Sequence, residues 1–280
     1  MKKALVVGIN DYAPAGPGGP DLGGCINDAR DMALTLNGLG IVPATPQNMK
    51  ILLNANATRA NILTGLTWLV TGAKAGDTLV FYYSGHGSWV VDTSGDEADH
   101  RDEAICPHDF QAAGMIIDDQ LRALFTRLPA GATLEVILDS CFSGTATRLA
   151  PTSPNEQGFT PRFVEPAEEH QIYAEANPVI SWKRILRPAR GEKVVVIVPG
   201  LNHVLWAASA NNQTSGEGPI GGVVRGYFTY CFCNNLRATH AAASRAWLDG
   251  IVRNCIRQFT LSQTPQLEAS AGEVLQQPFK

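Results

Sequence analysis

The 280-residue sequence lacks the features of a membrane protein and of a nucleic-acid-binding protein. No apolar run approaches the roughly 18 residues that span a bilayer, and the apolar stretch from Ala4 to Ile9 is too short for the core of a secretory signal. With 22 Lys and Arg against 26 Asp and Glu, the formal net charge is -4, which offers no basic field for phosphates. We therefore expect a cytoplasmic protein with no membrane partner and no nucleic-acid partner.

Cysteine is also sparse, and its spacing excludes two classes of small fold. The six cysteines contain no Cys-x-x-Cys pair, so neither a disulfide scaffold nor a zinc ribbon is predicted, and reduced thiols are expected. Cys231 and Cys233 are separated by one residue in a predicted helix and point in different directions, which favours packing over metal binding. The six histidines form no ligand cluster, and the chain has no internal repeat.

What the chain does contain is an alternation of apolar strands and amphipathic helices. Hydrophobic residues make up 45% and charged residues 17%, the balance of a folded globular protein. Strands are predicted at residues 3–9, 49–53, 78–83, 133–138, 194–198 and 203–208, and helices from about Asn27, after Thr58, after Asp118, and at 227–236 and 243–259. This order predicts an α/β fold with a mainly parallel sheet covered on both faces and functional groups at the carboxyl ends of its strands.

The alternation breaks between Thr145 and Glu192, where prolines gather and periodicity fades. No helix or strand is predicted there. A loop of that length in a compact domain is usually either functional or flexible.

Two of the predicted strands end in residues that can carry chemistry. The strand at 78–83 runs into a turn with His86 between two glycines, and the strand at 133–138 runs into Cys141. If the two strands are neighbours, thiol and imidazole face each other, which is the minimum equipment for acyl transfer. The amide of Gly87 could join that of Cys141 in holding an oxyanion.

Taken singly, each of these residues has a simpler interpretation. A free cysteine is most often a small buried hydrophobe, and a histidine in a glycine-rich turn is often only a loop residue. The joint pattern favours catalysis over both.

Several motifs together carry a resemblance to a known family. They are Tyr83-Ser-Gly-His86-Gly, Asp139-Ser-Cys141-Phe-Ser-Gly144, Lys3-Ala-Leu-Val-Val-Gly-Ile-Asn10, Cys25-Ile-Asn-Asp28-Ala, Asp102-Glu-Ala-Ile-Cys-Pro107-His-Asp109 and Leu205-Trp-Ala-Ala-Ser-Ala-Asn-Asn-Gln-Thr-Ser-Gly-Glu217. The chain resembles the metacaspase and bacterial caspase-like (orthocaspase-type) cysteine peptidases of the caspase family, clan CD. Its histidine lies 55 residues before the cysteine, near the caspase spacing of about 50. The Gln-Ala-Cys motif of animal caspases is absent.

The resemblance implies one caspase-like domain over residues 1–280, a three-layer sandwich with a mainly parallel central sheet flanked by helices. Residues 1–144 would form the large-subunit-like part with the His/Cys site, 145–192 an irregular linker-like excursion, and 193–280 the small-subunit-like part. No adaptor segment is expected before the first strand. The implied activity is that of a cysteine endopeptidase with Cys141 as nucleophile and His86 as acid and base. The alternatives are a catalytically inactive scaffold that binds peptides or partner proteins, and a calcium-responsive switch; the intact His-Cys pair counts against the scaffold.

The family relation also implies a pocket for the side chain before the cut (P1). Asp28 and Asp139 occupy the matching positions, with Cys25 and Ser84 beside them. Two carboxylates beside a thiol would hold a guanidinium or an ammonium group and repel an acid, so we expect polypeptide substrates with Arg or Lys at P1. Without the resemblance, Asp28 would be taken as a first-turn helix acid and Asp139 as a strand-end acid.

Many of the acids lie between Asp92 and Asp119, and hard cations prefer such oxygens. The resemblance implies a calcium site with acids matching Asp102, Asp118 and Asp119, completed by an acid shortly after the nucleophile. Residues 145–149 contain no carboxylate and include Arg148. We therefore expect no required cofactor and weak or irrelevant calcium binding, and the alternative for these acids is a solvated loop.

An enzyme that cuts after basic residues would carry its own cleavage sites in the excursion, because poorly packed segments are where nicking concentrates. The candidates are Arg148, Arg162, Lys183, Arg184, Arg187 and Arg190. We expect cleavage after Lys183 or Arg184 first and after Arg162 next. Arg187 comes last because proline follows it. The alternative is that proline and local structure shield these bonds.

Overall fold

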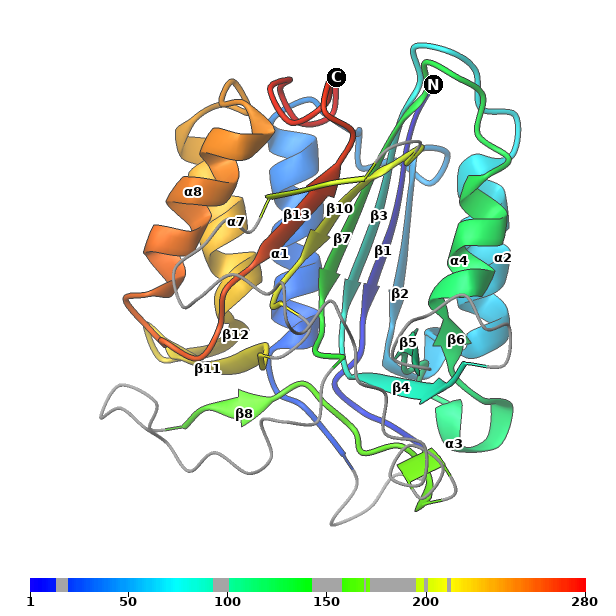
Figure 1. The fold of residues 1–280 in the computed structure, drawn as a ribbon, viewed down its shortest axis with the longest axis vertical. Helices are drawn as coiled ribbons and strands as arrows, with labels where there is room; N and C mark the ends of the chain where they lie inside the picture. Colours follow the sequence, from blue (N-terminus) through cyan, green and yellow to red (C-terminus); the bar gives the residue numbers. More distant parts are fainter. Residues whose placement is uncertain are drawn as a thin grey trace.

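A seven-stranded sheet runs through the middle of the molecule (Figure 1). This computed structural model describes residues 1–13, 20–92, 101–142, 158–168, 170–171, 195–198, 201–210 and 213–280. The strand order is β2-β1-β3-β7-β10-β13-β9, and the strands from β2 to β10 are parallel, while β13 is antiparallel to β10. Their bounds are β1 (Lys2–Gly8), β2 (Met49–Leu53), β3 (Thr78–Ser84), β7 (Thr133–Asp139), β9 (Val195–Ile197), β10 (Val204–Ala207) and β13 (Gln266–Ala269).

Helices cover both faces of this sheet, as Figure 1 shows. The helices on one face are α1 (Cys25–Gly38), α7 (Tyr227–Ala238) and α8 (Arg245–Ile256), and those on the other are α2 (Arg59–Val70) and α4 (Asp118–Phe125). Because successive side chains of a strand point to opposite faces, Tyr82 packs in the cluster with Phe232, whereas Phe81 packs in the cluster with Leu66. The predicted three-layer α/β fold is confirmed.

The helix starts follow from local chemistry. Thr58 caps α2 as predicted, because its hydroxyl accepts a hydrogen bond from the Asn61 amide at 3.3 Å. Helix α4 begins at Asp118, with two acids in its first turn, where they suit the positive end of the helix dipole. None of the helices within the described ranges combines the length and the apolar character that crossing a bilayer would require.

Two small sheets lie beyond the carboxyl ends of β1, β3 and β7, at the bottom of Figure 1. One contains β4 (Gly87–Val91), β5 (Arg101–Ile105) and β6 (Ile116–Ile117), and the other contains β8 (Thr160–Pro161), β11 (Gly216–Ile220) and β12 (Val223–Gly226). The short helices α3 (Phe110–Ala113) and η1 (Asn54–Asn56) complete the elements named here. None of these short elements was predicted, and β8 lies within residues 145–192, where the sequence pattern indicated neither a helix nor a strand.

A disulfide joins Cys231 of α7 to Cys255 of α8. The expectation of reduced thiols is therefore wrong for this pair, because two cysteines 24 residues apart meet only once the two helices pack side by side. Cys233, on another side of α7, is free and buried in the core, as its spacing from Cys231 indicated.

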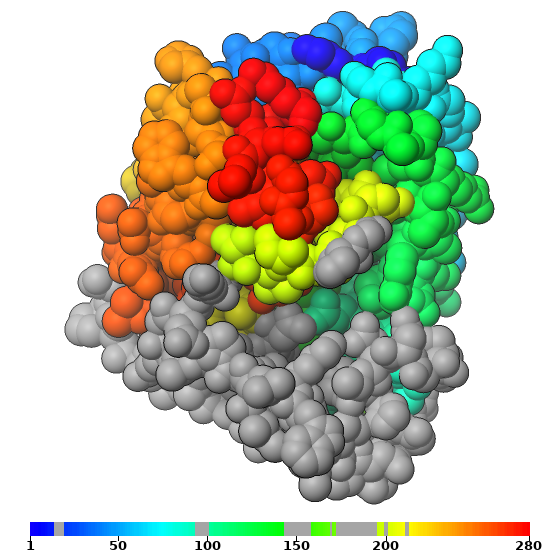
Figure 2. All heavy atoms as spheres, turned by 45° about the horizontal axis from the view of Figure 1, so that its top comes forward, coloured from blue at the N-terminus to red at the C-terminus, as the bar shows by residue number. Residues whose placement is uncertain are grey.

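A buried ion pair ties the C-terminal residues to the central sheet. The guanidinium of Arg245 contacts the Glu135 carboxylate of β7 at 2.6 Å, and both side chains are almost fully buried. Glu135 also accepts hydrogen bonds from the Trp206 indole at 2.6 Å and from the Phe279 amide at 2.9 Å. Figure 2 shows the C-terminal residues (red) lying between the helical residues in orange and the residues in green.

Candidate active site

The two strands that precede His86 and Cys141 are neighbours in the sheet. Strands β3 and β7 are parallel, and Ser84 pairs with Asp139 at their carboxyl ends, so each candidate side chain follows two residues after a paired position. This confirms the predicted neighbourhood of the strands. Both side chains are covered in this structure, with His86 4% and Cys141 0% exposed.

The His86 ring is held by a backbone carbonyl. Its Nε2 forms a short hydrogen bond with the carbonyl oxygen of Pro20, and since that oxygen can only accept, Nε2 carries the proton. Within the described ranges Nδ1 makes no hydrogen bond, which leaves a lone pair free for proton transfer. The His86 backbone is fixed as well, because its amide donates to the Tyr12 hydroxyl at 2.7 Å and its carbonyl accepts from the Tyr83 hydroxyl at 2.7 Å.

The environment keeps this imidazole neutral. Burial lowers the pKa of His86 to about 4, and the bond to Pro20 only partly opposes that effect. At neutral pH the ring is therefore a base. The Cys141 thiol donates a hydrogen bond to the carbonyl of Gln213 at 3.2 Å.

A carbonyl oxygen lies where the sequence predicted an oxyanion site. The amides of Gly87 and Cys141 both donate to the carbonyl oxygen of Arg162, at 3.0 and 3.2 Å. Gly87 permits this arrangement, because a methyl group on it would lie 2.2 Å from the Cys141 carbonyl oxygen. Two converging amides of this kind can stabilise negative charge on a carbonyl oxygen.

The side chain of the same arginine fills a pocket of carboxylates. The guanidinium of Arg162 contacts Asp28 at 2.5 Å, Asp139 at 2.9 Å and Glu217 at 3.0 Å, and it is fully buried. It also donates to the Ser84 hydroxyl at 2.9 Å. A buried guanidinium with several carboxylate partners has strong, charge-assisted hydrogen bonds.

The four residues predicted for the P1 pocket lie together around this guanidinium. Besides Asp28, Asp139 and Ser84, these include Cys25, whose thiol donates to Glu217 at 3.8 Å. The role of Glu217 was missed: it lies in a motif that carried the resemblance, but no spacing links it to the start of α1. The amides of Gly23 and Gly24 orient its carboxylate, at 2.6 and 3.1 Å.

The pocket holds more negative than positive charge. Burial raises the pKa of Asp28 to about 7, and the neighbouring Asp139 adds to the rise, while Arg162 opposes it. Gly226 closes the pocket without filling it, because a methyl group there would lie 2.6 Å from Arg162 Nη1 and 2.3 Å from Asp139 Oδ2. The amide of Gly226 donates to both oxygens of Asp28 at 3.0 Å.

The segment around Arg162 crosses the site as an extended strand. Pro161 pairs with Gly216 of β11 in an antiparallel register, and the Arg162 amide donates to the Ser215 carbonyl at 3.0 Å. On the other side of the arginine, the Val164 amide donates to the Gly87 carbonyl at 3.0 Å. Of the basic residues considered for self-cleavage, only Arg162 lies within the described residues.

The acids predicted for calcium lie on two elements. Asp102 lies on β5 and is buried, whereas Asp118 and Asp119 begin α4, where both form ion pairs with Arg122. Among the residues that the structure describes, no three acidic, histidine or cysteine side chains converge as metal ligands. Residues 93–100, and Arg148 with its neighbours, lie outside the described ranges, so the calcium expectation stays a prediction.

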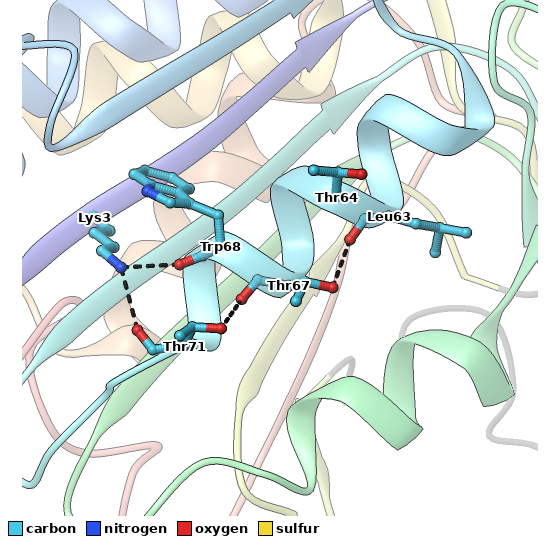
Figure 3. A pocket seen from close by; sticks show the side chains of 6 residues that line it. All are labelled: Lys3, Leu63, Thr64, Thr67, Trp68 and Thr71. Atoms are coloured by element: carbon cyan, nitrogen blue, oxygen red, sulfur yellow. Dashed lines mark hydrogen bonds between the residues drawn. The ribbon is translucent and has the colours of Figure 1, made fainter.

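A surface cavity of about 500 Å³ lies far from this chemistry, near the amino end of β1 (Figure 3). Its lining residues are Lys3, Leu63, Thr64, Thr67, Trp68 and Thr71. The ammonium group of Lys3 donates to the backbone carbonyls of Trp68 and Thr71, at 2.9 and 3.3 Å, at the C-terminal end of α2. None of the six is a cysteine or a histidine, so this cavity is not the better catalytic candidate.

Comparison with known proteins agrees with the geometry at the ends of β3 and β7. The family model described as "Metacaspase, peptidase C14 domain" matches residues 2–150. Metacaspase-1 from Coccidioides immitis is 33% identical over 292 residues, which cover 96% of this chain and 61% of that protein. Metacaspase-1A from Aspergillus oryzae is 32% identical over 302 residues, which cover 99% of this chain and 70% of that protein. The chain thus spans 61% of the length of the first relative and somewhat more of the second.

Solved structures show the same fold. Protein GSU0716 from Geobacter sulfurreducens superposes with a TM-score of 0.67 at 24% identity, covering all of this chain and 98% of that one. Caspase-1 from Spodoptera frugiperda superposes with a TM-score of 0.58 at 12% identity, covering 96% of this chain and 86% of that one. At these identities the likeness establishes the architecture and no more.

Proposed function

Because the chain belongs to the metacaspase family of cysteine-type endopeptidases, peptidase C14, we propose that it hydrolyses peptide bonds after arginine or lysine. The observation that carries the proposal is Arg162. Its guanidinium is enclosed by three carboxylates while its carbonyl oxygen accepts from two amides. An arginine whose guanidinium and carbonyl oxygen are both bound in this way has the arrangement expected of a bound P1 residue.

The proposed mechanism uses the groups around that carbonyl. His86 Nδ1 accepts the thiol proton of Cys141, and the sulfur attacks the carbonyl carbon of the P1 residue. The amides of Gly87 and Cys141 stabilise the oxyanion, a contribution of about 2.7–4 kcal/mol per donor in comparable enzymes. The imidazolium returns its proton to the departing amine, which leaves a thioester on Cys141.

Hydrolysis completes the cycle. Neutral His86 deprotonates a water molecule, the resulting hydroxide attacks the thioester, and the sulfur leaves and recovers the proton. The Pro20 carbonyl keeps Nε2 as the protonated nitrogen throughout, so Nδ1 faces the reaction as the base. The Pro20 carbonyl takes the place of the third residue that orients the base in other nucleophilic enzymes.

The selectivity for basic residues is proposed to come from surplus charge. Asp28, Asp139 and Glu217 surround one guanidinium, so an arginine gains charge-assisted hydrogen bonds that an acidic side chain would replace with repulsion. The planar fork of arginine can donate two parallel hydrogen bonds to a carboxylate, whereas an ammonium group binds as a compact point charge without that geometry. We therefore propose a preference for Arg over Lys.

We further propose that the chain cuts itself after Arg162. The bond to Phe163 follows a carbonyl already held by the two amides, and the Phe163 ring packs against Trp89 and Cys141. This arrangement favours Arg162 over Lys183 and Arg184, reversing the order expected from the sequence. While the segment is bound, Cys141 and His86 are covered, so cleavage or displacement of the segment would open the site to other substrates.

The test uses purified full-length protein, with Cys141→Ala as the matched control, on fluorogenic peptides ending in Arg, Lys or Asp. Wild type should turn over the Arg peptide fastest and the Asp peptide not measurably, and Cys141→Ala should be inactive. Intact-mass spectrometry of the same samples should give fragments 1–162 and 163–280 in wild type alone. Turnover by folded Cys141→Ala protein, or cleavage after Asp, would reject the proposal.

The alternative of an inactive scaffold makes the opposite prediction in the same experiment. There the arginine would be a permanent plug, and neither peptide turnover nor fragments would be seen. The neutral, oriented base at His86 favours the enzyme, because a plug alone needs no imidazole with an unused lone pair at the carboxyl end of β3.

A further inference from the structure

The segment in the candidate site also places an aromatic side chain three residues before Arg162. The ring of Phe159 stacks on that of Tyr227, with centroids 6.1 Å apart and 26° between the planes. Tyr227 in turn stacks on Phe259 at 5.4 Å and 7°, and Tyr230 meets Phe259 edge to face at 5.7 Å. Phe159 is therefore the outer ring of a stack that α7 and the turn after α8 supply.

Two glycines of β11 leave room for these rings. A methyl group on Gly216 would lie 2.3 Å from the Phe159 ring, and one on Gly218 would lie 2.1 Å from the Tyr227 hydroxyl. Side-chain carbons do not approach other atoms that closely. Both rings thus contact the backbone of β11 where it carries no side chain, and any other residue at either glycine would displace a ring.

Backbone pairing fixes how far this stack lies from the pocket of carboxylates. Thr160 pairs with Glu217 and Pro161 with Gly216, and the Arg162 amide donates to the Ser215 carbonyl. A peptide that binds with its basic residue in the same register therefore brings the side chain three residues earlier (P4) to the face of Tyr227. Between Phe159 and Arg162, Thr160 is exposed and Pro161 is half-buried, so these two side chains contribute less to the binding of the segment.

We infer that the enzyme has a P4 subsite for an aromatic side chain, formed by Gly216, Gly218, Tyr227 and Phe259. The substrate class becomes peptides with an aromatic residue three positions before the arginine or lysine. This deepens the proposed function and rests on it, since the register is defined by the arginine in the P1 pocket. The occupant is identified by Phe159, which already lies on the stack.

The first test compares peptides on wild-type full-length enzyme. The probes are acetyl-Phe-Thr-Pro-Arg, acetyl-Leu-Thr-Pro-Arg and acetyl-Ala-Thr-Pro-Arg, each with the same fluorogenic leaving group. The chain's own segment competes equally with all three, so the ratios of kcat/KM are independent of it. The Phe peptide should exceed the Ala peptide by about tenfold or more, with Leu between them. Equal kcat/KM values for Phe and Ala, with Arg still required, would overturn the subsite and leave the proposed function standing.

Enzyme variants locate the effect. Tyr227→Leu should reduce the Phe-to-Ala ratio to about threefold or less, because apolar volume remains while ring stacking is lost. Phe259→Leu should act in the same direction and serves if Tyr227→Leu does not fold. Trp68→Leu, at the opposite end of the sheet, is the matched control and should keep the wild-type ratio. An unchanged ratio in folded Tyr227→Leu or Phe259→Leu would assign the preference elsewhere.

A second readout needs no turnover at all. In Cys141→Ala protein, Phe159→Ala should speed hydrogen exchange of the Arg162 amide by about tenfold, because the outer anchor of the segment is lost. Thr160→Ala is the control, since that side chain is exposed, and should leave the exchange rate unchanged. If no peptide is cleaved, the proposed function fails and this experiment decides alone: equal exchange in the Phe159→Ala and Thr160→Ala proteins would overturn the subsite.

Discussion

Two arginines are buried in the part of the chain that the structure describes, and their surroundings differ. Arg245 meets one carboxylate, that of Glu135, whose oxygens also accept from the Trp206 indole and the Phe279 amide. Arg162 meets three carboxylates and a hydroxyl. The first cluster is balanced in charge, whereas the second has two formal negative charges more than positive ones when all its acids are ionised.

The two arginines also differ in how they are anchored. Arg245 begins a twelve-residue helix packed on the sheet, whereas Arg162 follows a two-residue strand. Releasing the arginine from a charge-balanced ion pair on a long helix would only lose stability. A surplus of carboxylates around an arginine on a short strand suits a site that exchanges one basic side chain for another. The difference separates a core ion pair from a proposed specificity pocket.

Removing each arginine in turn should give the largest difference between the two clusters. Arg245→Ala should lower the free energy of unfolding by about 3–5 kcal/mol, because Glu135 stays buried with its charge unpaired. Arg162→Ala should cost less than about 2 kcal/mol, because the segment can leave and water can reach the carboxylates. Urea unfolding of both variants in the Cys141→Ala background measures the difference. Equal losses would mean that Arg162 is as structural as Arg245.

Neutralising one acid in each cluster tests whether the two clusters also differ in their effect on catalysis. Asp139→Asn should lower kcat/KM on Arg peptides by about tenfold or more, on the order of 1.5–3 kcal/mol for a charged hydrogen bond. Glu135→Gln, the matched control in the core, should leave kcat/KM per folded molecule unchanged, and Arg should outperform Lys in wild type. Steady-state kinetics with both peptides tests this. A full-strength Arg preference in Asp139→Asn would remove the pocket from the specificity argument.

The surplus charge also predicts a dependence on pH. Burial raises the pKa of Asp28 to about 7, so its carboxylate gains negative charge as the pH rises through the neutral range. His86, with a pKa lowered to about 4, stays neutral over that range. We expect kcat/KM for Arg peptides to rise about fivefold from pH 6 to pH 8, as the pocket gains a charge. Asp28→Asn should be slower but flat with pH, and a profile that falls over this range would contradict the assignment.

The sequence predicts the large parallel sheet well and the small sheets poorly. Long apolar strands such as 78–83 and 133–138 carry their own signal, because both of their faces are buried. Strands β4, β8 and β11 are short and contain or adjoin Gly87, Gly158, Gly216 and Gly218, which read as turns. They become strands only by pairing with distant segments, which no local pattern encodes.

The site divides along a similar line. His86 and Cys141 could be proposed as a pair because each follows a predicted strand, and those two strands are neighbours in the sheet. The Pro20 carbonyl, which orients His86, and the Arg162 carbonyl, which occupies the two amides, are backbone atoms that every residue type carries. The role of Glu217 could not be read either, because β11 meets the start of α1 only in the folded chain, 193 residues away in sequence from Gly24.

A third group of acids gives the smallest expected effect. Asp118 and Asp119 resemble Glu135 more than the pocket of Arg162, because Arg122 of their own helix pairs with both. Their charge is already partly balanced, and residues 145–149 supply no further carboxylate for a cation. We therefore expect a calcium chelator to change kcat/KM on Arg peptides by less than about twofold, with added calcium equally ineffective. The control is Asp118→Asn, which should respond to chelator and calcium as wild type does. The prediction would be contradicted if wild type strictly required calcium and Asp118→Asn lost the activation by calcium. These acids would then belong to a metal site, completed by carboxylates such as Asp96 or Asp99 outside the described residues.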